Sequence, residues 1–217
     1  VLDVTPAFSI DTSDEFENMA THTTKTIRDL LKHVDSDELV LPEIQRDFVW
    51  SARIVMKLFD SLFRGMPIVH ILVWKVRQAV EFKAFSKKAN PQHPGQIESF
   101  YGYLLDGQQR LTAIARVKDR DPDYPLKFNL RPVDTDPTDT RFAWESRRNA
   151  DDPWFVSVAN VLNKSLKPVQ MLDEIRAREA VTADEAEKIQ EDFMKLQGIL
   201  DYHIGITEFE SDDYREA

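Results

Sequence analysis

The segment Leu-Leu-Asp-Gly-Gln-Gln-Arg-Leu-Thr (residues 104–112) holds the residues with the clearest chemical potential. An apolar strand, an Asp-Gly turn and an amphipathic helix follow one another there, so backbone N–H groups and the positive end of a helix dipole meet at one point. Arg110 lies in the first turns of this helix, where a guanidinium group can bind phosphate oxygens. Asp106 ends the strand, where a carboxylate can hold Mg²⁺ or orient a water molecule. The segment therefore predicts a phosphate-binding site.

The same residues also allow a structural interpretation. Asp-Gly is common in turns, Asp106 could cap the helix, and Arg110 could pair with Asp106 and do nothing more. Gln108 and Gln109 add amide groups that can position a water molecule without transferring protons themselves. Because strand–turn–helix anion sites are frequent and do not define a function, the residues alone leave both interpretations open.

A second polar motif, Leu-Pro-Glu-Ile-Gln-Arg-Asp-Phe-Val-Trp (residues 41–50), lies between a predicted strand and a predicted helix. Aromatic residues in loops either stack on nucleic-acid bases or cover a hydrophobic core. For Trp50 we favour the core-covering role, whereas Phe48 could do either. Gln45 and Arg46 are harder to explain as core residues, which makes them candidate ligand-binding groups.

The hydrophobic pattern predicts an α+β chain that would position these motifs. Helices are expected at residues 27–35, 52–64, 108–118, 169–176 and 183–200, the last opened by a Thr-x-x-Glu capping box. Strands are expected at residues 38–41, 68–76, 81–85, 101–105, 126–130, 142–144 and 204–209. Residues 154–162 fit either a strand or a helix, and a further helix would begin at Ser211.

The composition excludes several classes of protein. The chain has 217 residues, 42% of them hydrophobic, and no Cys, which removes disulfide frameworks, thiolate metal sites and cysteine nucleophiles. The five histidines show no metal-ligand spacing. No apolar run is long enough to span a membrane and the N-terminus has no signal-peptide pattern. We therefore expect a cytoplasmic protein that does not contact membranes, and a processed or truncated piece of it, since the chain starts with Val1.

The charge is unevenly distributed along the chain. The net charge is −10, and residues 170–217 hold five basic against fourteen acidic residues, so the remainder is close to neutral. Residues 70–120 hold nine Lys or Arg against four acids, with aromatic residues interleaved. Such a stretch suits contact with a nucleic-acid backbone, for which the candidates are Lys87, Lys88 and Arg116. An ordinary solvated surface explains the same lysines.

The two motifs, together with Leu-Phe-Asp-Ser-Leu-Phe-Arg-Gly-Met-Pro-Ile (residues 58–68), resemble the DGQQR-signature domain. That family is typified by the N-terminal half of GmrSD-type modification-dependent restriction enzymes and by SspE-type phosphorothioate-sensing defence proteins. The resemblance implies a ParB/sulfiredoxin-like mixed core with additional C-terminal helices. It also implies binding and Mg²⁺-dependent hydrolysis of a nucleoside triphosphate, GTP, UTP or CTP rather than ATP, coupled to a nuclease elsewhere in the full protein.

Carried over by position, the family's nucleotide motif falls on Asp106, Gly107, Gln108, Gln109 and Arg110, and its upstream pair on Gln45 and Arg46. Asp106, Gln109 and Arg110 would be catalytic, with Mg²⁺ held by Asp106. The expected DNA partner is modified or phage DNA, contacted through the full-length protein. The alternative is a module that senses DNA or nucleotide without hydrolysis.

The resemblance also has a limit, because the family continues with a Phe-x-x-x-Asn helix, a Gly-rich loop and a His-Asn-His type nuclease that do not occur before Ala217. We therefore expect three parts: a flexible arm at residues 1–23, a ParB-like nucleotide-binding domain at 24–167, and a helical extension at 168–217. The extension would return to a final core strand and be truncated before the rest of the protein.

Overall fold

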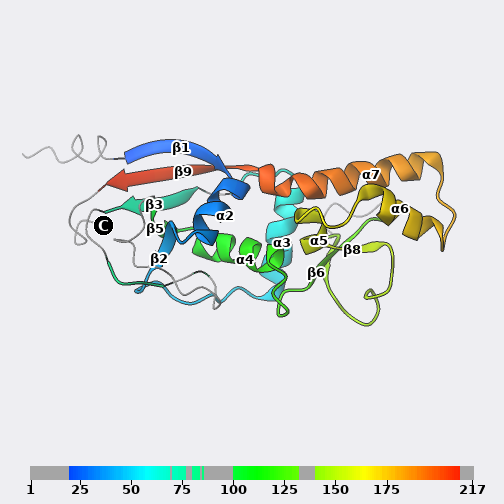
Figure 1. The fold of residues 1–217 in the computed structure, drawn as a ribbon, viewed down its shortest axis with the longest axis horizontal. Helices are drawn as coiled ribbons and strands as arrows, with labels where there is room; N and C mark the ends of the chain where they lie inside the picture. Colours follow the sequence, from blue (N-terminus) through cyan, green and yellow to red (C-terminus); the bar gives the residue numbers. More distant parts are fainter. Residues whose placement is uncertain are drawn as a thin grey trace, which may run out of the picture.

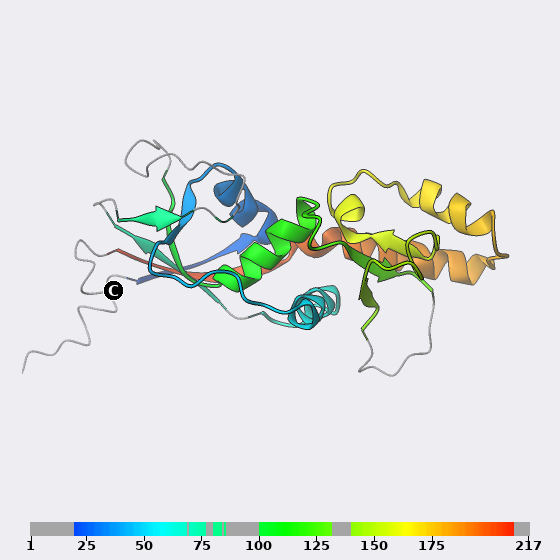
Figure 2. The same cartoon turned by 90° about the horizontal axis from the view of Figure 1, so that it is seen from below.

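The computed structural model describes residues 20–68, 70–76, 80–83, 85, 100–131 and 140–210. Figures 1 and 2 show a larger sheet at one end of the molecule and a smaller sheet with α6 and α7 at the other. The elements are β1 (Ala20–Thr26), α2 (Ile27–Asp35), β2 (Leu39–Pro42), α3 (Ala52–Phe63), β3 (Ile71–Lys75), β4 (Phe82–Lys83), β5 (Gly102–Asp106), α4 (Gln108–Lys118), β6 (Leu126–Asn129), β7 (Phe142–Trp144), β8 (Phe155–Ser157), α5 (Val158–Leu162), α6 (Pro168–Arg176), α7 (Ala183–Gln197), the 3₁₀ helix η2 (Gly198–Asp201) and β9 (His203–Glu210).

The larger sheet is mixed, with the strand order β1-β9-β3-β5-β2-β4. The pairs β3–β9 and β2–β5 are parallel, and the pairs β1–β9, β3–β5 and β2–β4 are antiparallel. The predicted α+β class is therefore confirmed, and the chain returns through β9 to the interior of this sheet as expected. The ParB/sulfiredoxin-like topology stays a prediction.

The predicted N-terminal arm, residues 1–23, extended too far along the chain, because β1 begins at Ala20. Residues 20–23 belong to β1, in which Ala20 pairs with Phe209 and Thr26 with His203. The strand was missed because it lies at the sheet edge and its side chains are polar, so no apolar alternation marks it. Its four threonines carry the β propensity instead. The remainder of the arm lies outside the described residues.

The main core is one cluster of buried residues from both sheets and their helices, in which α2 packs against β1 and β2 of the larger sheet and α3 against α4 and β7. Thr26 caps α2 by accepting a hydrogen bond from the Asp29 backbone N–H. Neighbouring strand residues alternate between the two sheet faces, so Val73 joins the main core while Trp74 joins a smaller cluster with Val40 and Tyr103. Helix α4, at residues 108–118 as predicted, buries Leu111, Ile114 and Val117. This packing fixes the start of α4 relative to the end of β5.

The smaller sheet has the order β7-β6-β8 and is accompanied by α5, α6 and α7. The ambiguous residues 154–162 form both alternatives in succession, because β8 ends at Ser157 and Ser157 then caps α5. The predicted capping box is confirmed: the Thr182 hydroxyl accepts from the Glu185 N–H and the Glu185 carboxylate accepts from the Thr182 N–H. Within the described residues no helix has both the length and the apolar composition needed to cross a membrane. The helix expected from Ser211 lies outside them.

Candidate functional site

The junction between β5 and α4 forms the base of the candidate site. Gly107 joins the two elements in a left-handed conformation with φ of 101°. A Cβ atom at this position would lie 2.9 Å from Ile71 Cγ1, so only glycine fits the turn without displacing β3. The N–H groups of the first turn of a helix have no partner within the helix, and here they belong to residues that line a pocket.

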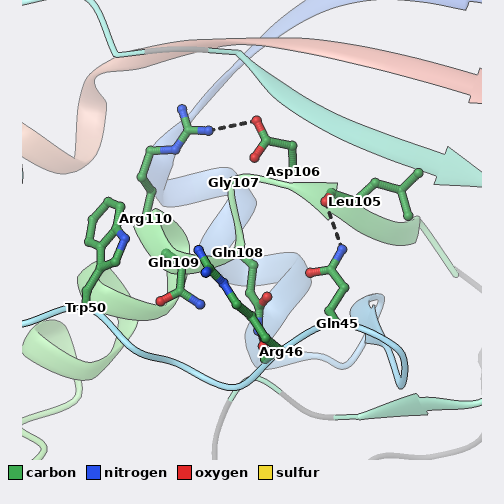
Figure 3. A pocket seen from close by; sticks show the side chains of 9 residues that line it. All are labelled: Gln45, Arg46, Trp50, Leu105, Asp106, Gly107, Gln108, Gln109 and Arg110. Atoms are coloured by element: carbon green, nitrogen blue, oxygen red, sulfur yellow. Dashed lines mark hydrogen bonds and ion pairs between the residues drawn. The ribbon is translucent and has the colours of Figure 1, made fainter.

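The pocket has a volume of about 360 Å³ and brings both sequence motifs together (Figure 3). Its lining contains every residue that the motifs predicted as a nucleotide site, together with Trp50 and Leu105: Gln45, Arg46, Trp50, Leu105, Asp106, Gly107, Gln108, Gln109 and Arg110. Residues separated by about 60 positions in the chain thus form one site. A volume above about 300 Å³ is typical of small-molecule pockets.

The two glutamines of the DGQQR motif are buried and hold the 43–50 loop against α4. Gln108 Nε2 donates to the Arg46 carbonyl at 2.8 Å, and Gln109 Nε2 donates to the Asp47 carbonyl at 3.1 Å. Gln109 Oε1 accepts from the Val49 N–H at 2.9 Å. We expected these amides to position a water molecule. In the structure the Gln109 amide instead bonds to the backbone of Asp47 and Val49, the two neighbours of Phe48, and so fixes the loop.

Gln45 anchors the other end of the same loop. Strand β2 pairs with β5 only as far as Tyr103, and Gln45 Nε2 then donates to the next two carbonyls of β5, those of Leu104 at 2.7 Å and Leu105 at 2.8 Å. Lys83 Nζ donates to the Gln45 main-chain carbonyl. The loop backbone is therefore held from β4, β5 and α4.

The two arginines of the pocket differ in their surroundings. Arg110 Nη2 lies 3.0 Å from Asp106 Oδ2, with the Arg110 side chain 16% and the Asp106 side chain 63% exposed. The pairing that the structural interpretation expected is therefore present. Arg46 is exposed, and among the described residues its guanidinium has no hydrogen-bond or ion-pair partner. Gln108 holds the Arg46 main chain, so the cationic side chain extends from a fixed backbone position in the lining of the pocket.

The aromatic residues of the loop divide between the core and the pocket. Phe48 and Trp50 both pack against the main core, as expected for Trp50. Trp50 also lines the pocket, a role that the sequence did not reveal because aromatic type alone does not separate a core lid from a pocket wall. Phe48 lies edge-on to Tyr124 at 5.6 Å and below the Arg116 guanidinium at 4.8 Å.

Of the three predicted nucleic-acid residues, the structure describes only Arg116. Arg116 stacks on Phe48 and donates to the Tyr124 hydroxyl at 3.1 Å, so its charge is used inside the molecule. Of the other basic residues in this stretch, Lys75 pairs with Glu208 at 2.6 Å and Lys118 with Asp35 at 3.1 Å. Lys87 and Lys88 lie outside the described residues.

The described residues contain no group of three His, Asp or Glu side chains close enough to hold a metal ion together. A metal cage made of protein alone is therefore absent from this part of the chain. Mg²⁺ differs from Zn²⁺ in that one or two carboxylates and the phosphates of a substrate often suffice to bind it. The exposed carboxylate of Asp106 fits that mode of binding.

Fold and site together define a mixed α+β domain with a polar pocket at a strand–glycine–helix junction, a geometry that suits anions in proteins generally. The chain belongs to the family of GmrSD restriction endonuclease N-terminal domains, which matches residues 27–217. This match confirms the resemblance to GmrSD-type proteins inferred from the motifs. The chain is also similar to the uncharacterized protein MJ0686 of Methanocaldococcus jannaschii, at 30% identity over 116 residues, which are 51% of this chain and 20% of that protein. It thus matches only about a fifth of the length of that curated relative.

Proposed function

We propose that the pocket binds a nucleoside triphosphate with Mg²⁺ and hydrolyses it, and that this turnover regulates a nuclease of a restriction enzyme. The observation that carries the proposal is the Arg46 guanidinium, which has no partner among the described residues and lines the same pocket as the N-terminus of α4. Two sources of positive potential in one pocket favour a ligand with several negative charges. The family match supports the restriction context.

Arg46 and the first N–H groups of α4 would bind the phosphates. The loop contacts of Gln108 and Gln109 order the backbone that carries Arg46 before a ligand arrives, so binding has to order only the Arg46 side chain. The guanidinium of arginine can donate two parallel N–H bonds to two oxygens of a phosphate group. The ammonium group of lysine has no such planar pair of donors. Gly107 allows the close approach of the ligand to the backbone, because it carries no side chain.

We assign Asp106 to the terminal phosphate of the ligand, where hydrolysis takes place. Its carboxylate is exposed to the pocket while Arg110 fixes its orientation, an arrangement that can orient an attacking water molecule. Mg²⁺, when bound to the phosphates, would neutralise charge that develops on them during hydrolysis. Gln109 acts as a positioning residue in this scheme, because both ends of its amide already bond to the loop backbone.

The preference for GTP, UTP or CTP over ATP is carried by the resemblance alone and forms part of the proposal. We also propose that the complete protein contains the nuclease, acts on modified or phage DNA and works in the cytoplasm. The family's description as a restriction endonuclease supports a nuclease partner.

Phosphate release with GTP, UTP, CTP and ATP in the presence of Mg²⁺ tests the proposal. We expect release with at least one nucleotide and its loss in Asp106→Asn, which keeps the side-chain shape. Asp173→Asn, at an exposed position of α6, is the matched control and should release phosphate at the wild-type rate.

The longer protein is measured beside this chain, since the family continues beyond these residues in our interpretation. Equal rates for wild type and Asp106→Asn would contradict the assigned site. Nucleotide binding without phosphate release in both proteins would favour the alternative, a sensing module that does not hydrolyse its ligand.

A further inference from the structure

The orientation of the Gln45 amide is fixed by its hydrogen bonds. The same nitrogen, Nε2, lies 2.7 Å from the Leu104 carbonyl and 2.8 Å from the Leu105 carbonyl. Carbonyl oxygens only accept, so the amide NH₂ group must face them and both of its protons are used. The side-chain oxygen Oε1 is therefore turned away from β5, and Figure 3 shows it directed to the pocket side of Gln45.

This orientation adds an uncharged acceptor to the lining of the pocket. Gln45 Oε1 and the exposed Asp106 carboxylate lie on the same side in Figure 3, with Trp50 on the opposite side. Arg46 and the first N–H groups of α4 supply donors. The amide nitrogens of Gln108 and Gln109 each use one of their two protons on a carbonyl of the loop.

A phosphate group cannot satisfy Gln45. Bound phosphate oxygens carry negative charge and no proton at neutral pH, so they repel a carbonyl oxygen. The parts of a nucleotide that can donate to Gln45 are its hydroxyl and N–H groups. In a nucleoside triphosphate these donors are found on the sugar and the base.

We infer that Gln45 accepts a hydrogen bond from the nucleoside part of the ligand and so orients it, with the phosphates directed to Arg46. This inference rests on the proposed nucleotide site and adds to it the role of Gln45 as a specificity-determining residue. The pocket then discriminates between a nucleoside triphosphate and inorganic triphosphate, although both carry the phosphates that bind Arg46.

Equilibrium binding of three ligands to the wild-type chain provides the first test, by isothermal titration calorimetry with Mg²⁺ present. The ligands are the nucleotide bound most tightly among GTP, UTP, CTP and ATP, its 2′,3′-dideoxy analogue and inorganic triphosphate. We expect inorganic triphosphate to bind about 2- to 10-fold more weakly than the nucleotide, the usual size of one lost neutral hydrogen bond. Weaker binding of the dideoxy analogue assigns the donor to the sugar, and unchanged binding assigns it to the base.

Two substitutions at Gln45 provide the second test. Gln45→Lys keeps N–H donors for the Leu104 and Leu105 carbonyls but removes the acceptor, whereas Gln45→Met removes both. Within each variant we expect the nucleotide and inorganic triphosphate to bind with equal affinity. The lysine variant should bind both ligands more tightly than the methionine variant, because its added charge attracts the phosphates of both. Gln170→Met, exposed on α6, is the control and should keep the wild-type preference.

The outcomes separate this inference from the proposed function. Equal binding of nucleotide and inorganic triphosphate by the wild type would overturn the role of Gln45 and leave a phosphate site intact. A preference that persists in Gln45→Lys would do the same. No binding of any ligand by the wild type would overturn the proposed function and this inference with it. If Gln45→Met unfolds, Gln45→Lys and the wild-type ligand series still decide.

Discussion

Arg46 and Arg110 show how two identical residue types in one pocket can have different roles. Arg110 is largely buried and paired with Asp106, so part of its charge is already neutralised within the protein. Arg46 is exposed and, in the described part of the chain, has no such partner. In the proposed site a ligand phosphate would therefore gain more from Arg46, whereas Arg110 would mainly set the position of the Asp106 carboxylate.

Arg46→Met should weaken nucleotide binding about 10- to 100-fold, since hydrogen bonds to charged groups contribute about 1.5–3 kcal/mol. Thermal stability should stay close to wild type, because the side chain is exposed. Calorimetric titration gives the affinity and circular dichroism the melting temperature. Arg53→Met, also at an exposed position, is the control, and an equal loss of affinity in both variants would mean that only net charge matters.

Gln109→Met should destabilise the fold as well as the site. The substitution leaves the Asp47 carbonyl and the Val49 N–H without their partner, which costs about 1–3 kcal/mol in free energy of unfolding. Urea unfolding measures this cost. Gln190→Met, exposed on α7, should change the free energy by less than about 0.5 kcal/mol. A Gln109 variant as stable as this control would show that the two bonds do not hold the loop.

The sequence predicted which residues gather in the pocket but not what their side chains do there. The motifs, through the family that they resemble, selected Gln45, Arg46 and residues 106–110, all of which line it. Whether a side-chain amide binds a ligand or the backbone depends on which backbone groups nearby lack a partner. The Leu105 carbonyl lies beyond the part of β5 that pairs with β2 and accepts from Gln45 for this reason. That information arises only when β2, β5 and α4 are placed in space.

At the scale of elements, the β5–α4 junction depends on a single conformation of Gly107. Gly107→Ala should cost about 2 kcal/mol or more, because the left-handed conformation is strained for alanine and the Cβ atom would lie 2.9 Å from Ile71 Cγ1. Gly198→Ala is a matched control at φ of −74° with no atom within 4 Å of its Cβ position. Urea unfolding of both variants should show a loss for the first only, and equal stability would argue against strain at the junction.

A charged cluster joins three strands of the larger sheet. Glu208 on β9 pairs with Lys75 on β3 at 2.6 Å and accepts a hydrogen bond from Tyr101, which precedes β5. Burial alone would raise the pKa of Glu208, but the hydrogen bonds from Lys75 and Tyr101 outweigh it and lower the pKa below the ordinary value of 4.5. Burial and the Glu208 carboxylate raise the pKa of Tyr101, which keeps its proton at neutral pH.

This cluster predicts acid sensitivity of the fold. A carboxylate with a lowered folded-state pKa contributes stability above its ordinary pKa of 4.5 and loses that contribution as the pH falls through the folded value. Glu208→Gln should therefore be less stable than wild type at neutral pH, and the difference should shrink below pH 4.5. Urea unfolding across this range tests it, with Glu187→Gln, exposed on α7, as control. A difference that is independent of pH would contradict the assignment.

Predictability at this scale depended on local signals. The Thr182 capping box and the apolar face of α4 lie within a few residues, so sequence patterns located both helices. Strand β1 has polar, exposed side chains and is defined by its pairing with β9, a partner about 180 residues away. Pairing at that separation leaves no local pattern, and the strand orders of both sheets were hidden for the same reason.

On the scale of the whole molecule, aromatic contacts join the pocket to the smaller sheet. Phe48 in the pocket loop contacts Tyr124 at 5.6 Å, and Tyr124 contacts Trp144 on β7 at 6.0 Å. On α3, Phe63 contacts Phe128 on β6 at 4.7 Å. One core cluster contains buried residues from both sheets. The α+β class followed from the sequence, but the gathering of β6–β8 with α5–α7 at one end did not.

The continuous core predicts that both ends of the molecule unfold together. Calorimetry should give one transition whose calorimetric and van't Hoff enthalpies agree. Two independently folding domains would instead give two transitions. Phe63→Ala should lower the free energy of unfolding by about 3–5 kcal/mol, because removing this buried ring leaves a cavity between α3 and the smaller sheet. Since both sheets share this core, the variant should shift the whole transition. Loss of one sheet at a lower temperature, with the other unchanged, would mean that the two sheets are independent units in spite of their shared core.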